Sequence, residues 1–129
     1  MTPERRGVDG PVVGALVADL FFSSRIVPAL KTIGYSVWLA ASGETVEAQS
    51  RLKPPSLVLV DLGIRGADWE TAVAHLRTER PDLPIVAFGP HKDLGARERA
   101  LAAGCNEVVA NSKLATDLRR LVGRWVPAP

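Results

Sequence analysis

The feature that most constrains the fold is a run of four aliphatic residues that ends in a carboxylate, Leu57-Val58-Leu59-Val60-Asp61. A strand with one face in water alternates apolar and polar residues, whereas a strand covered on both faces is apolar throughout. Pro55-Ser56 precedes this run and Leu62-Gly63 follows it, and proline, serine and glycine are typical near the ends of a strand. The run therefore predicts a central strand of a parallel sheet, with Asp61 at its carboxyl end.

Short apolar runs alternate with helix-like patterns along the rest of the chain. The predicted strands are residues 12–18, 36–39, 57–61, 85–88 and 107–110. Between them, apolar residues recur at helical spacing, most clearly from Phe22 to Ile33, from Trp69 to Leu76 and from Leu114 to Trp125. Such alternation is typical of βαβ units. We expect one doubly wound α/β domain over residues 12–125, with five parallel strands and five helices, between flexible segments at 1–11 and 126–129.

The ends of the predicted helices carry residues that stabilise helix ends. Ser42, Asp68, Asp93 and Ser112 stand where N-caps are expected, and Gly34 and Gly104 stand just past helix ends, where glycine best adopts a positive φ. Pro28 conflicts with this pattern, because it would fall near the end of the first turn of a helix that begins at Ser23 or Ser24. We expect an adjusted first turn there.

The predicted helix over residues 94–103 has a weaker apolar pattern than the others. It offers mainly Leu94 and Leu101 to a core, with charged residues at 97–99 between them. We therefore expect this helix to be shallowly buried and to be the one most free to move.

Composition agrees with a small α/β domain and limits its functions. Aromatic residues make up only 5% of the chain, so the core is built from Val, Leu, Ile and Ala. The single Cys105 excludes an internal disulfide, fits a reducing compartment and is expected to be buried. The net charge of +2 gives weak support for nucleic-acid binding, and no apolar run approaches the ~20 residues of a membrane span. We expect a cytoplasmic protein that binds neither nucleic acid nor membrane.

Polar residues follow several of the predicted strands. In an open α/β sheet the carboxyl ends of the strands form the ligand-binding edge. The residues expected there are Asp19, Asp61, Gly89, His91 and the segment from Asn111 to Lys113. Two carboxylates beside backbone carbonyls can hold Mg²⁺, which would bring a phosphoryl group to one of them. Asp61 could instead only cap its own loop, and His75 and His91 are expected at the surface because no nucleophile accompanies them.

Several segments make the chain resemble the receiver domains of bacterial response regulators over almost the whole folded unit. They are residues 57–62, residues 80–86 before the fourth strand, residues 99–107 before the fifth strand, and residues 34–37. The resemblance implies a flavodoxin-like fold with receiver topology. It also implies that Asp61 is the phosphoacceptor, and that Asp19, Asp61 and Gly63 are the ligands of Mg²⁺.

The residues around Asp61 depart from the family's pattern. The family's acidic pair corresponds to Ala18-Asp19, its hydroxyl residue to Gly89, its switch aromatic to Val108 and its lysine to Asn111. Lys113 is expected on the outer face of the last helix rather than in the site, and Arg65, at the position of a usual proline, is expected to be a solvated loop residue. At least two of the three groups that normally compensate a phosphoryl charge are therefore missing.

Three functions remain open at this point. The leading hypothesis is a stand-alone, atypical receiver (a pseudo-receiver), which is not an enzyme and signals by binding a protein partner, with phosphorylation weak or lost. The partner would be a histidine kinase, a downstream effector or a second copy, and a face with Arg97, Lys113, Arg120 and Arg124 suits an acidic partner or a homodimer. The first alternative is a phosphorelay receiver in two-component signalling, with Asp61 phosphorylated and Mg²⁺-dependent activation. The second is a small α/β enzyme or nucleotide-binding domain, for which the chain shows no glycine-rich phosphate loop.

Overall fold

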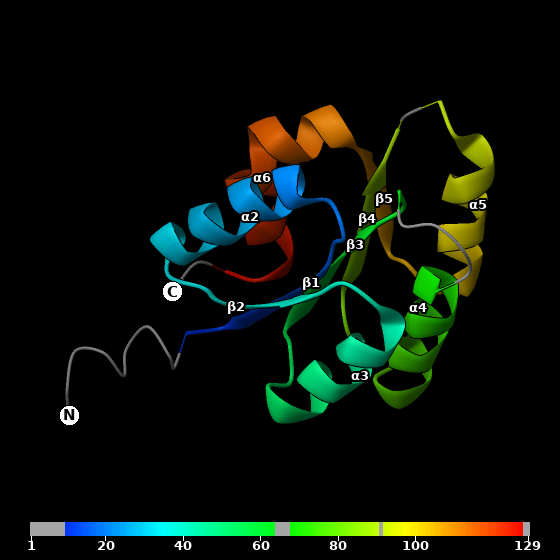
Figure 1. The fold of residues 1–129 in the computed structure, drawn as a ribbon, viewed down its shortest axis with the longest axis horizontal. Coiled ribbons are helices and arrows are strands. Elements are labelled where there is room, and N and C mark those ends of the chain that lie inside the picture. The colour runs from blue at the N-terminus through cyan, green and yellow to red at the C-terminus, as the bar shows by residue number, and fades with distance from the viewer. Residues whose placement is uncertain (1–9, 64–67, 91, 128–129) are drawn as a thin grey trace.

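A computed structural model gives the fold of the chain and describes residues 10–63, 68–90 and 92–127, without the side chains of Phe21 and Asp68. Strands and helices alternate strictly (Figure 1). The strands are β1 (Val12–Leu16), β2 (Ser36–Ala40), β3 (Leu57–Asp61), β4 (Ile85–Gly89) and β5 (Glu107–Ala110). The helices are α2 (Leu20–Ile33), α3 (Gly43–Leu52), α4 (Asp68–Glu79), α5 (Leu94–Ala103) and α6 (Asn111–Trp125).

The strands form one parallel sheet in the order β2-β1-β3-β4-β5. β3 lies in the middle, and all five of its residues are buried, as the run of aliphatic residues predicts. The order reverses direction between β1 and β3, which is the point where open α/β sheets bind ligands. The prediction of a doubly wound sheet with flavodoxin-like receiver topology is confirmed.

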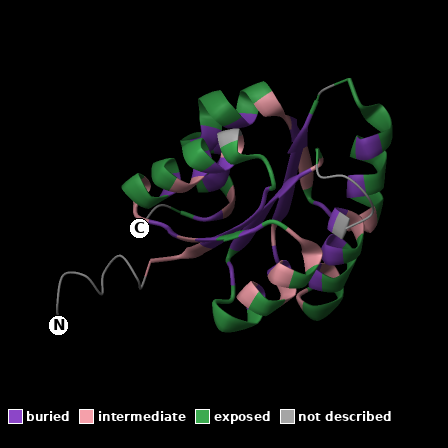
Figure 2. Cartoon of the chain, viewed as in Figure 1, coloured by how far each residue is buried: buried purple, intermediate pink, exposed green. Residues whose placement is uncertain are grey.

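Helices cover both faces of the sheet and make two separate cores. In Figure 1, α2 and α6 lie on one side of the sheet, and α3, α4 and α5 lie on the other. The first core includes Leu30 and Leu121, and the second includes Trp69 and Leu76. Figure 2 shows the buried strands as a continuous layer between helices whose outer faces are exposed. Each helix therefore has one face against the sheet and one face in the solvent.

Most of the predicted helix ends are confirmed. Ser42 accepts a hydrogen bond from the backbone N–H of Thr45, and Asp93 accepts one from Ala96. Gly34 and Gly104 have φ of 118° and 124°, a region that favours glycine. Ser112 is not the N-cap of the last helix, because that helix already begins at Asn111 and Ala110 precedes it without a side-chain cap.

Two predictions about helices are wrong. α2 begins at Leu20, so Pro28 lies inside the helix rather than in its first turn. In α5, Leu94 and Leu101 are 65% and 43% exposed, and the residues that face the sheet are Ala96 and Ala100. Small residues let a helix approach a sheet closely, so α5 packs through alanines. Its burial is shallow, as expected, but for this different reason.

The ends of the packed unit differ slightly from the predicted limits. The first strand ends at Leu16 rather than at residue 18, although the N–H of Val17 still donates to Ala40, at 3.0 Å. Val126, which the sequence places in a flexible tail, is buried, and its carbonyl accepts a hydrogen bond from the Tyr35 hydroxyl. None of the described helices is long and apolar enough to cross a membrane.

Candidate functional site

Asp61 lies at the carboxyl end of the central strand and is only 6% exposed. Its Oδ1 accepts a hydrogen bond of 2.8 Å from the backbone N–H of Gly63, so the carboxylate turns the chain at the start of the next loop. Burial raises the pKa of Asp61, the bond from Gly63 opposes this rise, and the negative charge of Asp19 adds to it. The carboxylate therefore lacks a compensating cation among the described residues.

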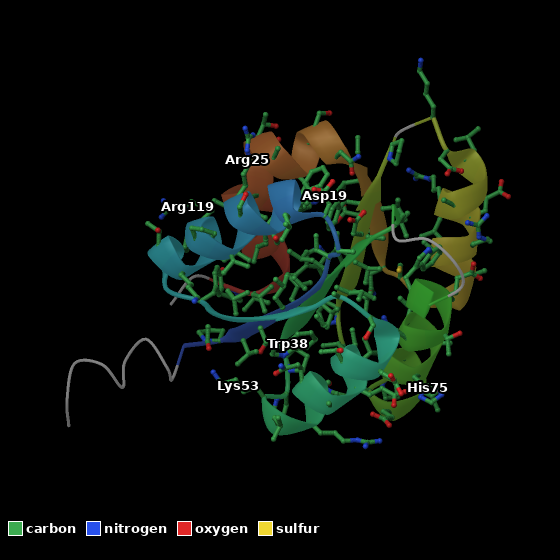
Figure 3. The ribbon with its side chains drawn as sticks, in the orientation of Figure 1. Asp19, Arg25, Trp38, Lys53, His75 and Arg119 are labelled. Atoms are coloured by element: carbon green, nitrogen blue, oxygen red, sulfur yellow. The ribbon has the colours of Figure 1, made fainter. Side chains whose placement is uncertain are left out.

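Asp19 lies beyond the end of β1, immediately before α2, and is exposed (Figure 3). Its effect on the pKa of Asp61 means that the two carboxylates are close enough to repel each other. Carboxylate and backbone carbonyl oxygens are the donors that Mg²⁺ takes, so Asp19, Asp61 and the carbonyl of Gly63 fit the chemistry of such an ion. A bound Mg²⁺ would also relieve the repulsion. No group of three or more His, Cys, Asp or Glu within the described residues forms a metal site.

On one side of β3, the strands β4 and β5 end in residues with neither a hydroxyl nor a charge. Gly89 ends β4 and pairs with Ala110 of β5, directly before Asn111. A Cβ at Gly89 would lie 3.1 Å from the Cβ of Leu62, so even a small side chain would press on this neighbour. The Oδ1 of Asn111 is buried and accepts no hydrogen bond in the described part of the chain. A buried amide oxygen without a hydrogen-bond donor costs free energy.

A cavity of about 150 Å³ lies next to these strand ends, under the first half of α5. Its lining consists of Leu62, Gly89, Pro90, Asp93, Leu94, Ala96, Arg97, Val108, Val109 and Ala110. Both Gly89 and Val108 border it; Val108, at the position of the switch aromatic of receiver domains, leaves space there, whereas a Cβ at Gly89 would already meet Leu62. The resemblance to receiver domains drew attention to these two positions, but the sequence alone could not show that a cavity lies beside them.

The other candidate residues lie away from Asp61 or outside the described residues. Lys113 is exposed on α6, where it borders a groove of about 210 Å³ with Asp117, Arg120 and Arg124. His75 is 57% exposed and pairs with Glu47 at 2.6 Å, which confirms a surface position (Figure 3). His91 and Arg65 are not among the described residues.

Cys105 is buried in the second core, as predicted. Burial raises the pKa of its thiol to about 12, although the positive charge of Arg77 opposes this rise. Thiolates rather than thiols react as nucleophiles, so this cysteine is inert in the folded protein.

No family model and no curated protein matches the chain in sequence. Solved structures do match it. One of them is the receiver domain of the sensor histidine kinase PA1611 from Pseudomonas aeruginosa. It superposes with a TM-score of 0.80 at 24% sequence identity, over 92% of this chain and 99% of that one. That structure has a magnesium ion coordinated in its active-site cleft.

Two other structures superpose equally well at lower identity. Chemotaxis protein CheY4 from Vibrio cholerae gives a TM-score of 0.81 at 16% identity, over 91% of this chain and 99% of that one. A CheY-like response regulator receiver domain protein from Methanospirillum hungatei gives 0.79 at 16% identity, over 90% and 93%. The chain therefore has the fold of the receiver domains of response regulators, with altered residues at the edge where Asp61 lies.

Proposed function

We propose that this chain is an atypical receiver that signals by binding a protein partner, and that phosphorylation of Asp61 is weak or lost. The observation that carries the proposal is the electrostatic state of Asp61. Its carboxylate is already buried and repelled by Asp19, Gly89 ends the adjacent strand β4, and Asn111 begins α6 directly after β5. A phosphoryl group would add about two negative charges to this place.

The missing side chains matter because each would lower the free energy of the phosphorylated state. An ammonium group beside the phosphoryl oxygens forms a charge-assisted hydrogen bond, which is about twice as strong as a neutral one. Asn111 can donate a hydrogen bond but supplies no charge, and Lys113 is exposed on α6. Mg²⁺ held by Asp19, Asp61 and Gly63 would then be the main compensation left, and the acyl phosphate would be poorly stabilised.

The surface supports partner binding. Arg97 on α5, together with Lys113, Arg120 and Arg124 on α6, lies on both sides of the edge strand β5. Arg124 pairs with Glu107 at 2.8 Å, but the others form no ion pair within the described residues. A face with unpaired positive charge attracts acidic partners and speeds their encounter.

The decisive experiment compares amide NMR spectra with Mg²⁺ and the phosphoryl mimic beryllofluoride. We expect wild type to show weak shifts or none at residues 61, 89 and 111, and to resemble Asp61→Asn. The variant Asn111→Lys, which adds the absent cation, should respond more strongly than wild type. Saturable shifts in wild type that Asp61→Asn abolishes would overturn the proposal.

That overturning result would instead support a phosphorelay receiver. The closeness of Asp19 to Asp61 favours this second candidate, because Mg²⁺ is commonly held by one or two carboxylates together with water. In that case Asp61 would accept the phosphoryl group, and the partner would be a histidine kinase or a small phosphodonor.

A further inference from the structure

The strand β2 forms one open edge of the sheet. It stands at the end of the strand order and pairs only with β1 among the described strands (Figure 1). The N–H of Ser36 donates to the residue just before β1 at 2.9 Å, and the carbonyl of Ala40 accepts from the residue just after β1 at 3.0 Å. Because backbone groups alternate in direction along a strand, Val37 and Leu39 point their N–H and C=O groups away from β1.

This edge lacks the features that usually block an open strand. Proteins protect edge strands with charged residues, prolines or bulges. The five described residues of β2, Ser-Val-Trp-Leu-Ala, contain no charge and no proline, and their pairing with β1 is continuous. Leu39 is 41% exposed although it lies in a strand. An open edge of this kind favours pairing with another strand.

A groove of about 400 Å³ lies beside the edge, on the face of the sheet that α2 covers. Its lining includes Val27 and Pro28 of α2 together with Val37 and Leu39 of β2. A strand that pairs with β2 would therefore place every second side chain in this groove, against apolar residues.

The outward backbone groups of β2 match those of a second copy. In an antiparallel pair, residues that exchange both hydrogen bonds alternate with residues that exchange none. When two β2 strands run antiparallel with Trp38 opposite Trp38, Val37 of each copy lies opposite Leu39 of the other. All the outward N–H and C=O groups of these two residues are then paired. The strand is thus self-complementary about a two-fold axis at Trp38.

Trp38 leaves room at this axis. Its side chain belongs to the core on the other face of the sheet and is only 5% exposed. A Cβ at Gly14, the residue of β1 that pairs with Trp38, would lie 2.2 Å from the indole ring, so the ring extends over β1 and away from the open edge. Opposite residues that exchange no bonds approach to about 4.5 Å between Cα atoms. Two indoles that each lean over their own β1 avoid a collision there.

The charge beside the groove does not oppose this pairing. Lys31 lies near the start of β2, because its carbonyl accepts a hydrogen bond of 3.0 Å from Gly34 in the turn that leads into the strand. A two-fold axis at Trp38 sets the start of one β2 beside the end of the other. Lys31 therefore approaches Leu39 of the second copy rather than the second Lys31, and like charges are not opposed.

We propose that two copies of this chain associate through their β2 edges, paired antiparallel about Trp38, and so join their sheets into one. The inference does not depend on the state of Asp61. Because β5 forms the opposite edge of the sheet, the dimer would hold its two β5 edges apart at its two ends.

Sedimentation and amide hydrogen exchange of the whole chain test the proposal together. Between about 1 μM and 1 mM, we expect the average mass to rise toward that of two chains. The amides of residues 37 and 39 should exchange at least about tenfold more slowly at the high concentration, because they become bonded. The amides of residues 107 and 109 are the control. Asn106 donates to Ile85 of β4 at 2.7 Å, so by the same alternation they point outward at the β5 edge, and their exchange should not depend on concentration.

A matched pair of variants assigns the contact to one edge. Leu39→Lys places a charge on β2 and should weaken association at least about tenfold. Leu101→Lys changes a leucine on α5 that is 43% exposed, close to the 41% of Leu39, and should associate like wild type. Equal urea midpoints for each variant and wild type at low concentration would show that neither change unfolds the chain.

Three results would overturn the inference. A mass of one chain at every concentration would exclude the dimer. Association that Leu101→Lys abolishes and Leu39→Lys does not would place the contact on α5. Protection of residues 37 and 39 that is the same at both concentrations would mean that β2 is covered within one chain. None of these results bears on phosphorylation, which the beryllofluoride experiment decides.

Discussion

Replacing Gly14 by alanine should destabilise the fold, although such a change in a strand usually stabilises it. Gly14 lies in β1, and a Cβ at this position would lie 2.2 Å from one ring carbon of Trp38 and 2.4 and 2.6 Å from two others. Ordinary carbon contacts are about 3.5–4.0 Å, so the indole would have to move by about 1 Å or more.

The indole has little freedom to move. Trp38 is 5% exposed, and its Nε1 donates a hydrogen bond of 3.0 Å to the carbonyl of Lys53 (both residues are labelled in Figure 3). Overpacking costs about 1–3 kcal/mol, and an indole N–H that loses its buried partner costs about 1–3 kcal/mol more. The entropic gain from replacing glycine offsets only about 0.5–1 kcal/mol. We expect the free energy of unfolding to fall by about 1–5 kcal/mol, at its upper end a large part of the stability of a small domain.

Urea denaturation followed by tryptophan fluorescence measures this change. Gly123→Ala is the control, because nothing lies within 4 Å of its added Cβ, and alanine favours the helix by about 1 kcal/mol. In a Trp38→Leu background, Gly14→Ala should cost less than about 1 kcal/mol, since the clashing ring is gone. A loss below about 1 kcal/mol in the wild-type background, or an equal loss without the indole, would refute the steric explanation.

Three further predictions concern single side chains. The pKa of Asp61 is raised in the folded protein, so its ionised form destabilises the fold at pH 7. Asp61→Asn should therefore have a higher urea midpoint than wild type at pH 7. This difference should vanish as the pH falls below about 4, where the carboxyl group is protonated in both the folded and the unfolded protein. Arg77→Ala should lower the free energy of unfolding by about 2–3 kcal/mol, because the guanidinium of Arg77 donates hydrogen bonds to the carbonyl of Gly104 at 2.7 Å and to Oδ1 of Asn106 at 2.8 Å. Arg77→Lys should also be less stable than wild type, since an ammonium group cannot make both bonds in this planar geometry. Equal urea midpoints for Arg77→Lys and wild type would contradict this explanation. Cys105, with a pKa of about 12, should resist iodoacetamide at pH 8 in the folded protein and react readily in urea, and fast reaction without urea would mean that the connection between α5 and β5 opens.

The fold could be predicted from the sequence because its main signals are local. The limits of β3 and β5 agree with the predicted ones, since each strand is an apolar run bounded by residues that end strands. The helix caps Ser42 and Asp93 depend on residues within one turn, so they too could be read from the chain. Consistency between local preference and the final fold explains this success.

The wrong predictions concern positions where the packing of a helix against the sheet, rather than the local sequence, determines the structure. Periodicity alone suggested that Leu94 and Leu101 face the core, but both are exposed, and the buried residues of α5 are the smaller Ala96 and Ala100. The helix around Pro28 begins earlier than its capping serines suggest, and its added first turn packs Phe22 against Phe88 of β4. For the site, the identities of Gly89 and Asn111 were visible in the sequence, whereas the cavity and the unpartnered amide oxygen are properties of the packed structure.

The hydrogen bond from the Tyr35 hydroxyl to the carbonyl of Val126 makes the absorbance of this tyrosine sensitive to the position of the C-terminal end of α6. The protein has one tyrosine, and its hydroxyl joins the start of β2 to the residue that follows α6. Burial raises the pKa of this phenol, while the positive charge of Arg119 on α6 opposes the rise. Any partner that lifts the last turn of α6 from the sheet would expose the phenol, so the ultraviolet absorbance of tyrosinate at alkaline pH would register the movement without an added label.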